Sequence, residues 1–318
     1  HLPYVERFGY RGLLEQAQAK YWIVNARRPF RWQVPRGAIV LQTWHGTPLK
    51  TIGKDVNLVT MPGNNAIKYH KQVYQDNRRW TYLLAPNLYS ARIMQRAFSK
   101  DANQMMLTGY PRNDILKNAT PDYVRKIKRR LRIAKGRTVV LYAPTWRDNE
   151  FIKNDEYTAH LHLDLAKIRQ HYGHQVVILV RTHYMISNHL DLSRYSDVAI
   201  NVSDYQDIAD LYLISDVLIT DYSSVMFDYS ILKRPMIFFD YDFDRYAKRT
   251  RGFYFDFKRV APGKIVTTTD QVIQQLDRIL AGRWRLNDNY RQFIKKFDPW
   301  MDGRASARVT KQLFSGRN

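Results

Sequence analysis

Short apolar runs alternate along this chain with segments in which apolar residues recur at helical spacing. The runs are rich in β-branched residues, and their alternation with helical segments favours parallel sheets joined by crossover helices. The expected strands are Tyr21–Asn25, Ala38–Thr43, Thr81–Ala85, Met105–Thr108, Val139–Ala143, Val176–Arg181, Val198–Asn201, Val217–Thr220 and Met236–Asp240. The pattern therefore predicts an α/β protein.

Residues that cap helices stand before several of the periodic segments. Thr, Ser and Asp side chains accept hydrogen bonds from the free N–H groups of a first turn, and Pro fits the first helical position. Helix starts are therefore expected at Thr47-Pro48, at Thr120-Pro121, at Ser203 before Asp204–Ile214, and at Thr268-Thr269-Asp270 before Val272–Leu280. Gly136 precedes a fresh strand, so a linker near residues 112–137 is expected to divide the chain into two domains.

The segment from Thr120 to Arg137 is both amphipathic and basic. Val124, Ile127 and Leu131 fall at helical spacing, while arginines and lysines cover most other positions. Two interpretations stay open: a solvated face on an interdomain helix, or a contact with an anionic membrane or another polyanion. Further basic clusters at residues 27–28, at 245–251 and from 291 onward favour the second interpretation.

Composition narrows the classes of partner and compartment. The formal charge of +22 requires an anionic partner, which could be nucleic acid, acidic lipid or a phosphate-rich substrate. Cysteine is absent, so a disulfide framework and a thiolate metal site are excluded, and a reducing compartment fits. No apolar run of about 18 residues and no signal-peptide layout is present. Because His1 stands where a Met would begin a chain, we expect a fragment.

Ligands of open α/β sheets bind beyond the carboxyl ends of the strands, and the segment Thr43–Lys50 occupies such a position. It presents His45 at a strand tip, beside the backbone N–H groups of Gly46 and Thr47, with Lys50 close behind. An ordinary histidine pKa near 6.5 suits a general base that acts on a hydroxyl. The alternative is a histidine with a purely structural role.

A second loop of this kind, Ile219–Asp228, carries Asp221, Ser223 and Ser224 between a buried strand and a helix. Serine hydroxyls and the N–H groups of a first helical turn can bind phosphate oxygens, although simple N-capping would explain the serines as well. Asp228, one turn later, is a candidate for hydrogen bonding to ribose hydroxyls.

Further candidates follow other predicted strands. Arg181 and His183 stand two positions apart and could together clamp a pyrophosphate. Arg112 and Asn113 follow one strand, Thr145 and Arg147 follow another, and all are expected to face the same cleft.

Several familiar functional motifs are absent or disfavoured in this sequence. Neither the P-loop nor the dinucleotide-binding glycine motif occurs. Asp240, Asp242 and Asp244 alternate beside basic residues, and a salt network is favoured there over a metal site.

Five ordered motifs resemble those of the CDP-glycerol glycerophosphotransferases of teichoic acid synthesis. They are Thr43–Lys50, Thr108–Asp114, Tyr142–Arg147, Arg181–His183 and Thr220–Ser224, and the resemblance runs from about Tyr21 to about Phe257. It implies a GT-B-type α/β fold, with two Rossmann-like domains facing across a cleft, and a transfer that needs no metal or cofactor.

The resemblance also implies roles for the candidate residues. His45 would take the proton from the acceptor hydroxyl. His183, with Arg181, Ser223 and Ser224, would hold the pyrophosphate and stabilise the charge that develops on it. The other expected substrate-binding residues are Gly46, Thr47, Lys50, Arg112, Asn113, Thr145, Arg147, Asp221 and Asp228.

The expected domains are an N-terminal acceptor-side domain over residues 1–118, a basic helix and linker over 119–137, a nucleotide-binding domain over 138–284, and C-terminal helices over 285–318 that could pack back on the first domain. Family members usually carry more strands and helices before the segment that matches Tyr21–Asn25, so the N-terminal domain is expected to be truncated.

The family resemblance implies CDP-glycerol or CDP-ribitol as donor and a lipid-linked polyol phosphate as acceptor. It also implies a peripheral location on the anionic cytoplasmic face of the bacterial plasma membrane. A sugar-nucleotide GT-B glycosyltransferase is the alternative enzyme. A nucleic-acid-binding protein is a more distant alternative, disfavoured because the basic residues are spread over segments that form no recognised binding motif.

Overall fold

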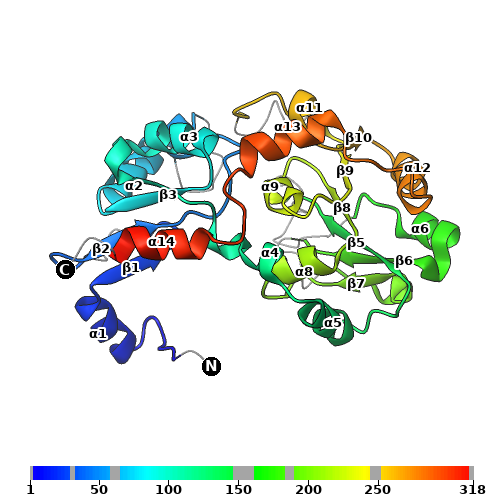
Figure 1. The fold of residues 1–318 in the computed structure, drawn as a ribbon, viewed down its shortest axis with the longest axis horizontal. Coiled ribbons are helices and arrows are strands. Elements are labelled where there is room, and N and C mark those ends of the chain that lie inside the picture. The colour runs from blue at the N-terminus through cyan, green and yellow to red at the C-terminus, as the bar shows by residue number, and fades with distance from the viewer. Residues whose placement is uncertain are drawn as a thin grey trace.

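The computed structural model describes residues 3–28, 33–57, 65–145, 161–182, 190–243 and 252–314. Two parallel β-sheets with helices packed around them lie next to each other in the molecule (Figure 1). We call the part built on the four-stranded sheet the N-terminal half and the part built on the six-stranded sheet the C-terminal half.

The N-terminal half has its four strands in sequence order, β1-β2-β3-β4. The strands are β1 Tyr21–Val24, β2 Ile39–Gln42, β3 Tyr82–Ala85 and β4 Met105–Leu107. The helices are α1 Tyr10–Gln18, α2 Ala66–Asn77, α3 Leu88–Phe98 and α4 Ile115–Asn118, with 3-10 turns η1 Gly53–Asp55, η2 Ala102–Gln104 and η3 Pro111–Asn113. All strand pairs are parallel, so the carboxyl ends of the strands share one edge of the sheet.

The C-terminal half has the strand order β10-β9-β8-β5-β6-β7. The strands are β5 Thr138–Ala143, β6 Val176–Val180, β7 Ala199–Asn201, β8 Val217–Thr220, β9 Met236–Phe239 and β10 Lys264–Val266. The helices are α5 Pro121–Arg130, α6 Leu165–Tyr172, α8 Ile208–Ile214, α9 Val225–Ser230, α11 Phe257–Val260 and α12 Thr269–Leu280, with 3-10 turns η4 Gly173–Gln175 and η5 Ser193–Tyr195. The chain order reverses between β5 and β8, and such a switch point is where open α/β sheets bind ligands.

Both faces of the six-stranded sheet are covered. Val140 packs in one apolar cluster and the next residue, Leu141, packs in the other, because successive side chains point to opposite faces. The cluster that contains Leu141 continues into the N-terminal half through Ile39 and Leu84. The two halves therefore share a continuous core.

The last two helices return from the C-terminal half to the N-terminal half. They are α13 Asp288–Phe297 and α14 Ala305–Phe314, and α14 lies beside β1 and β2 (Figure 1). The Asn87 side chain donates to the Phe297 carbonyl at 2.7 Å, and Arg308 Nε donates to the Thr108 carbonyl at 2.8 Å. The Phe314 ring meets the Tyr21 ring edge-on, with the centroids 4.7 Å apart.

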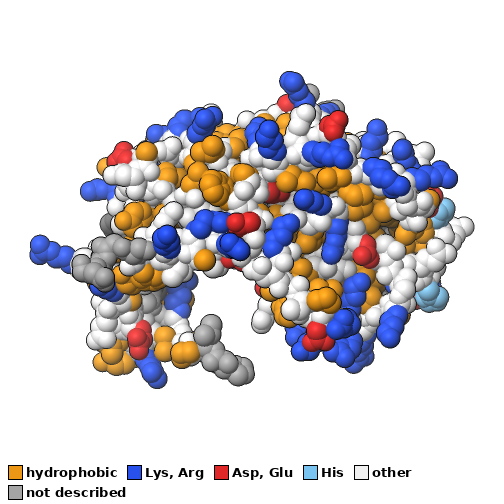
Figure 2. All heavy atoms as spheres, in the orientation of Figure 1, with side chains coloured by type: hydrophobic (Ala, Val, Ile, Leu, Met, Phe, Trp, Pro, Cys, Tyr) orange, Lys and Arg blue, Asp and Glu red, His pale blue; other side chains and the backbone are white. Residues whose placement is uncertain are grey.

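The basic helix α5 buries one face and exposes the other. Ile127 is buried, and Tyr123 donates a hydrogen bond to Asp210 of α8 at 2.7 Å. Lysines and arginines gather on the outer surface over α5 (Figure 2). None of the helices in the described part of the chain combines the length and the apolar character needed to cross a membrane.

The strand predictions are confirmed, since each of the nine segments forms a strand whose ends differ from the expectation by one residue at most. The short strand β10 was not predicted. The helix starts after Thr120 and Thr268 are confirmed, because both side chains accept a hydrogen bond from the third residue beyond.

Two predicted helix starts are wrong. After Thr47-Pro48 no helix begins, and the chain instead pairs with the C-terminal half: Thr51 N donates to the Gly252 carbonyl and Tyr254 N to the Leu49 carbonyl. Ser203 does not begin a helix either, because its hydroxyl accepts the backbone N–H of Thr182, and α8 begins only at Ile208, after Asp207.

Candidate active site

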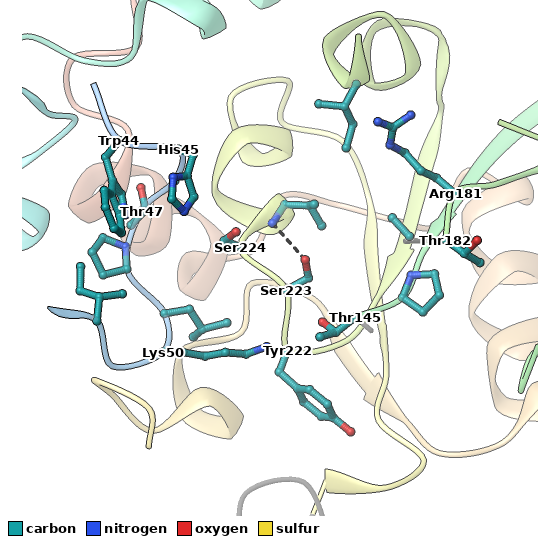
Figure 3. Close-up of a pocket in the computed structure, with 18 of the residues that line it drawn as sticks. Trp44, His45, Thr47, Lys50, Thr145, Arg181, Thr182, Tyr222, Ser223 and Ser224 are labelled. Carbon is teal, nitrogen blue, oxygen red and sulfur yellow. Dashed lines mark hydrogen bonds between the residues drawn. The ribbon is translucent and has the colours of Figure 1, made fainter. Parts of the chain in front are cut away.

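A cavity of about 510 Å³ lies where the loops that follow β2, β5, β6 and β8 meet (Figure 3). Its walls come from both halves of the molecule. The residues around it are Arg27, Trp44, His45, Gly46, Thr47, Pro48, Leu49, Lys50, Ile52, Tyr69, Ala143, Pro144, Thr145, Arg181, Thr182, Ile208, Tyr222, Ser223, Ser224 and Val225. The structure thus brings eight sequence-predicted residues together: His45, Gly46, Thr47, Lys50, Thr145, Arg181, Ser223 and Ser224.

A strained turn presents His45 to the cavity. Trp44 adopts φ of 56°, in the left-handed region, which costs roughly 1–2 kcal/mol for a residue with a side chain. The Gln42 side chain accepts the Trp44 N–H at 2.9 Å, and the indole stacks on the His45 ring with the centroids 4.4 Å apart. These contacts fix the orientation of the imidazole.

The hydrogen bond of His45 defines which nitrogen can act as a base. Nδ1 lies 2.9 Å from the backbone carbonyl of Asn25, and a carbonyl oxygen can only accept. In the neutral ring Nδ1 therefore carries the proton, and Nε2 keeps its lone pair.

The surroundings of His45 favour this neutral form. His45 is exposed at the cavity wall, but the surrounding protein removes part of the hydration of its ring, and this lowers the pKa of His45 below the ordinary 6.5. The charges of Arg112 and Arg27 lower the pKa further, and the Asn25 carbonyl opposes them. A neutral imidazole with an available Nε2 can accept a proton at neutral pH.

The serine loop forms the opposite wall. Ser224 occupies the N-cap position of α9, but its side chain makes no capping hydrogen bond, while Ser223 Oγ lies 3.4 Å from the N–H of Val225. A Cβ placed on Gly46 would come within 3.4 Å of Ser224 Oγ. A glycine at this position therefore lets the histidine loop and the serine loop approach closely.

Asp221 holds the loop after β5 rather than lining the cavity. Asp221 is 1% exposed, and its carboxylate accepts the Thr145 N–H, whose nitrogen lies 3.0 Å from both oxygens. This contact joins the carboxyl ends of β5 and β8 at the switch point and positions the Thr145 backbone.

Arg181 is anchored at the cavity wall by backbone carbonyls. Its Nη1 donates to Val202 at 3.1 Å and to Tyr205 at 2.7 Å. The Tyr205 hydroxyl in turn donates to Asp210, which also accepts the hydroxyl of Tyr123, both at 2.7 Å. The backbone of Tyr205 thus anchors the guanidinium directly, and the Tyr205 hydroxyl connects the same residue to Asp210 and α5.

Three other predicted residues form a cluster of their own. Asp228 accepts two hydrogen bonds from Arg112 Nη2, at 3.0 and 2.9 Å, and one from Asn113 Nδ2 at 2.7 Å. The Arg112 guanidinium also lies 4.2 Å from the centroid of the Tyr110 ring. The structure therefore places the Asp228 carboxylate between the halves, paired with a cation, and not among the residues that line the cavity.

Some expectations fall on parts of the chain that the structure does not describe. His183 and Arg147 lie outside the described residues, and so do Asp244 and the basic cluster at 245–251. Among the described residues, no group of three or more His, Cys, Asp or Glu side chains is arranged to hold a metal ion. Asp242 instead accepts the hydroxyl of Tyr222.

Some residues of the cavity wall are not among the site residues predicted from the sequence. Arg27, Tyr69 and Thr182 line the cavity, and Arg27 had been noted only as one of a basic cluster. Its place just after a predicted strand was the available signal, since Arg27 follows β1 as His45 follows β2. Tyr69 belongs to a helix and carried no such signal.

The family model described as CDP-Glycerol:Poly(glycerophosphate) glycerophosphotransferase matches residues 2–315. The chain belongs to this family. The family resemblance noted in the sequence is thereby confirmed.

Two curated relatives differ in how much of their length the chain covers. The chain is 43% identical over 317 residues to a teichoic acid glycerol-phosphate transferase of Staphylococcus aureus (strain NCTC 8325 / PS 47), which covers 99% of this chain and 81% of the relative. It is 42% identical over 314 residues to a teichoic acid poly(glycerol phosphate) polymerase of Bacillus subtilis (strain 168). There the match covers 98% of this chain and only 42% of the relative, so the chain spans less than half of that protein.

Solved structures confirm the fold. The wall teichoic acid polymerase TagF superposes with a TM-score of 0.91 at 40% identity, over 98% of this chain and 76% of that one. A UDP-GlcNAc 2-epimerase from Neisseria meningitidis is similar in fold alone, with a TM-score of 0.57 at 14% identity over 96% of this chain and 78% of that chain. The predicted GT-B-like α/β architecture is therefore correct.

Proposed function

We propose that this chain transfers glycerol phosphate from CDP-glycerol to a terminal hydroxyl of a polyol-phosphate acceptor and releases CMP. The observation that carries the proposal is the meeting of His45 with Ser223 and Ser224 across one cavity, at the switch point of the six-stranded sheet. Family membership supports the reaction class, and a TagF variant soaked with CDPG superposes with a TM-score of 0.91 at 39% identity.

In the proposed reaction the acceptor hydroxyl lies against Nε2 of His45, the ring nitrogen left without a proton. Nε2 removes the proton as the hydroxyl oxygen attacks the β-phosphorus of the donor. The bond from that phosphorus to the bridging oxygen breaks, and CMP leaves with the bonding electrons.

The opposite wall offers groups for the negative charge that develops during transfer. Ser223, Ser224 and Arg181 line the cavity on the C-terminal side, and we propose their hydroxyl and guanidinium groups as the donors. Charge-assisted hydrogen bonds of this kind stabilise a transferring phosphoryl group. His183 and Arg147 stay in the proposal as expected contributors from the family motifs.

The wider setting is also proposed. The acceptor would be a lipid-linked chain, and the basic outer face of α5 would rest on the anionic cytoplasmic surface of the plasma membrane. The proposal includes domain boundaries at residues 118, 137 and 284. It also includes CDP-ribitol as the alternative donor to CDP-glycerol. Flotation with anionic and neutral vesicles tests the membrane contact, which is refuted if anionic lipid captures no protein at moderate salt.

CMP release tests the reaction. CDP-glycerol, CDP-ribitol and a UDP-sugar are each supplied with a glycerol-phosphate acceptor, with and without EDTA. His45→Ala should lower acceptor-dependent release by at least about a hundredfold, since a positioned base contributes that much or more. His171→Ala is the matched control, because this exposed histidine pairs with Asp277 on α12, away from the cavity, and should leave the rate unchanged.

Two outcomes would contradict the proposal. Release from the UDP-sugar alone would make the protein a glycosyltransferase. Release from CDP-glycerol that survives unchanged in His45→Ala would remove the histidine from the reaction.

A further inference from the structure

The acceptor side of the cavity holds a cation that neither the motifs nor the proposed donor contacts use. Arg27 follows β1, next to the segment whose Asn25 carbonyl holds His45. Its guanidinium lies 4.8 Å from the centroid of the Tyr69 ring, and both residues line the cavity. Tyr69 is only 5% exposed, so the ring is a firm support.

The support determines which part of Arg27 can bind a ligand. A guanidinium stacked on an aromatic face keeps its N–H groups directed outward in its own plane, where they match two oxygens of a phosphate. Within the described residues Arg27 forms no ion pair with a carboxylate, while its charge is felt at both His45 and Asp76. The arginine is thus held in place by packing rather than neutralised by a salt bridge.

The two walls differ in what they can hold. Arg181 and the serine hydroxyls lie on the C-terminal side, where the donor pyrophosphate is proposed to bind. Arg27 lies on the N-terminal side, with the proposed base. In a polyol-phosphate chain a single polyol unit separates the reacting hydroxyl from the nearest phosphodiester. When the hydroxyl lies against the base, that phosphodiester therefore lies close by, where a cation beside the base can bind it.

We propose that Arg27, supported by the ring of Tyr69, binds the last phosphodiester of the acceptor and thereby delivers the adjacent hydroxyl to Nε2 of His45. This inference rests on the proposed function and adds the recognition of the acceptor. Arg27 would select a chain that already ends in a polyol phosphate over a neutral alcohol.

The test compares two acceptors with the same terminal glycerol. One carries the natural phosphodiester and the other a neutral linker of equal length in its place. Arg27→Ala should lower kcat/KM for the charged acceptor by roughly 10- to 100-fold, mainly through KM, as expected for loss of a charge-assisted contact. The neutral acceptor and the KM for CDP-glycerol should change by no more than about threefold, and Arg27→Lys should restore part of the loss.

Arg28→Ala is the matched control. Arg28 is the adjacent arginine, but its guanidinium lies 4.2 Å from the centroid of the Trp22 ring, and it is not among the residues around the cavity. This variant should retain the preference for the charged acceptor. Tyr69→Leu, which removes the supporting ring, should weaken that preference, whereas Tyr69→Phe should keep it.

Equilibrium binding of the charged acceptor without donor separates this inference from the proposed reaction. If wild type binds it and Arg27→Ala does not, the inference stands even where no CMP is released. If Arg27→Ala binds both acceptors as wild type does, or loses both equally, the inference is overturned while the proposed transfer can still hold. A rise in the donor KM alone would reassign Arg27 to the donor and would also overturn it.

Discussion

Removal of the Asp228 carboxylate should loosen the contact between the two halves of the molecule. The side chain accepts hydrogen bonds from Arg112 and from Asn113, both of which follow β4, while Asp228 itself belongs to α9. In Asp228→Ala the guanidinium of Arg112 would remain in place without its carboxylate. We therefore expect the main effect of Asp228→Ala to be a loss of folding stability rather than a loss of substrate binding.

The exposure of the two side chains sets the magnitude. Asp228 is 13% exposed and Arg112 is 36% exposed. Breaking a fully buried pair costs about 3–5 kcal/mol, and an exposed pair contributes at most about 1 kcal/mol. The pair lies between these limits, so Asp228→Ala should lower the free energy of unfolding by about 2–3 kcal/mol. Asp228→Asn keeps an acceptor oxygen for Asn113 and should cost about 1–2 kcal/mol.

A double-mutant cycle measures the pair itself. Urea unfolding of wild type, Asp228→Ala, Arg112→Ala and the double variant should give a coupling free energy of about 1–2 kcal/mol. Titration of the same proteins with CDP-glycerol shows whether the carboxylate also touches the donor. A loss of stability below about 0.5 kcal/mol together with a tenfold loss of donor affinity would refute the reasoning and support the ribose contact suggested by the sequence.

Three further results are expected. The kcat/KM for transfer should rise with pH through a midpoint below 6.5, because partial loss of hydration and the nearby arginines lower the pKa of His45 and only the neutral ring is a base. His45→Gln should abolish this rise. Gly46→Val should lower kcat/KM by at least about tenfold through a collision with Ser224, whereas Gly46→Ala, whose Cβ would sit at 3.4 Å, should stay within about threefold. Tyr205→Phe and Tyr123→Phe should each lower the free energy of unfolding by about 1 kcal/mol, since both hydroxyls donate to the buried carboxylate of Asp210. Only Tyr205→Phe should raise the donor KM severalfold, because the Tyr205 backbone anchors Arg181. Equal donor KM values in the two variants would contradict this.

The strands of this protein could be predicted because burial dictates their composition. Every residue of β6, Val176–Val180, is buried, and a short continuous apolar run of this kind is typical of a strand covered on both faces. The strand β10, Lys264–Val266, was missed because it is short, pairs along one side only, and has an exposed lysine. The position of β10 in the sheet is set by its pairing with β9, and its three residues show no pattern that predicts a strand.

The candidate site could be predicted only as far as strand ends reveal it. His45 and the two serines were found because each follows a buried strand. The course of the chain after Thr47 could not be found, since it depends on pairing with Gly252–Tyr254, some two hundred residues away. The partner of Asp228 was missed for the same reason, because helical position shows which side chains share a face but not which distant loop approaches them.

The long-range contacts also explain how the two walls of the cavity stay aligned. The loop that carries His45 belongs to the N-terminal half, yet its continuation is bonded to Gly252 and Tyr254 of the chain that follows β9. The Tyr254 hydroxyl accepts the Ile52 N–H and donates to Asp55, which Arg96 of α3 also binds. The proposed base and the serine hydroxyls are therefore set at their separation by folding itself. Because a reacting group misplaced by about an ångström can cost a hundredfold in rate, these bonds far from the cavity are as much a condition of the proposed transfer as the residues that line it.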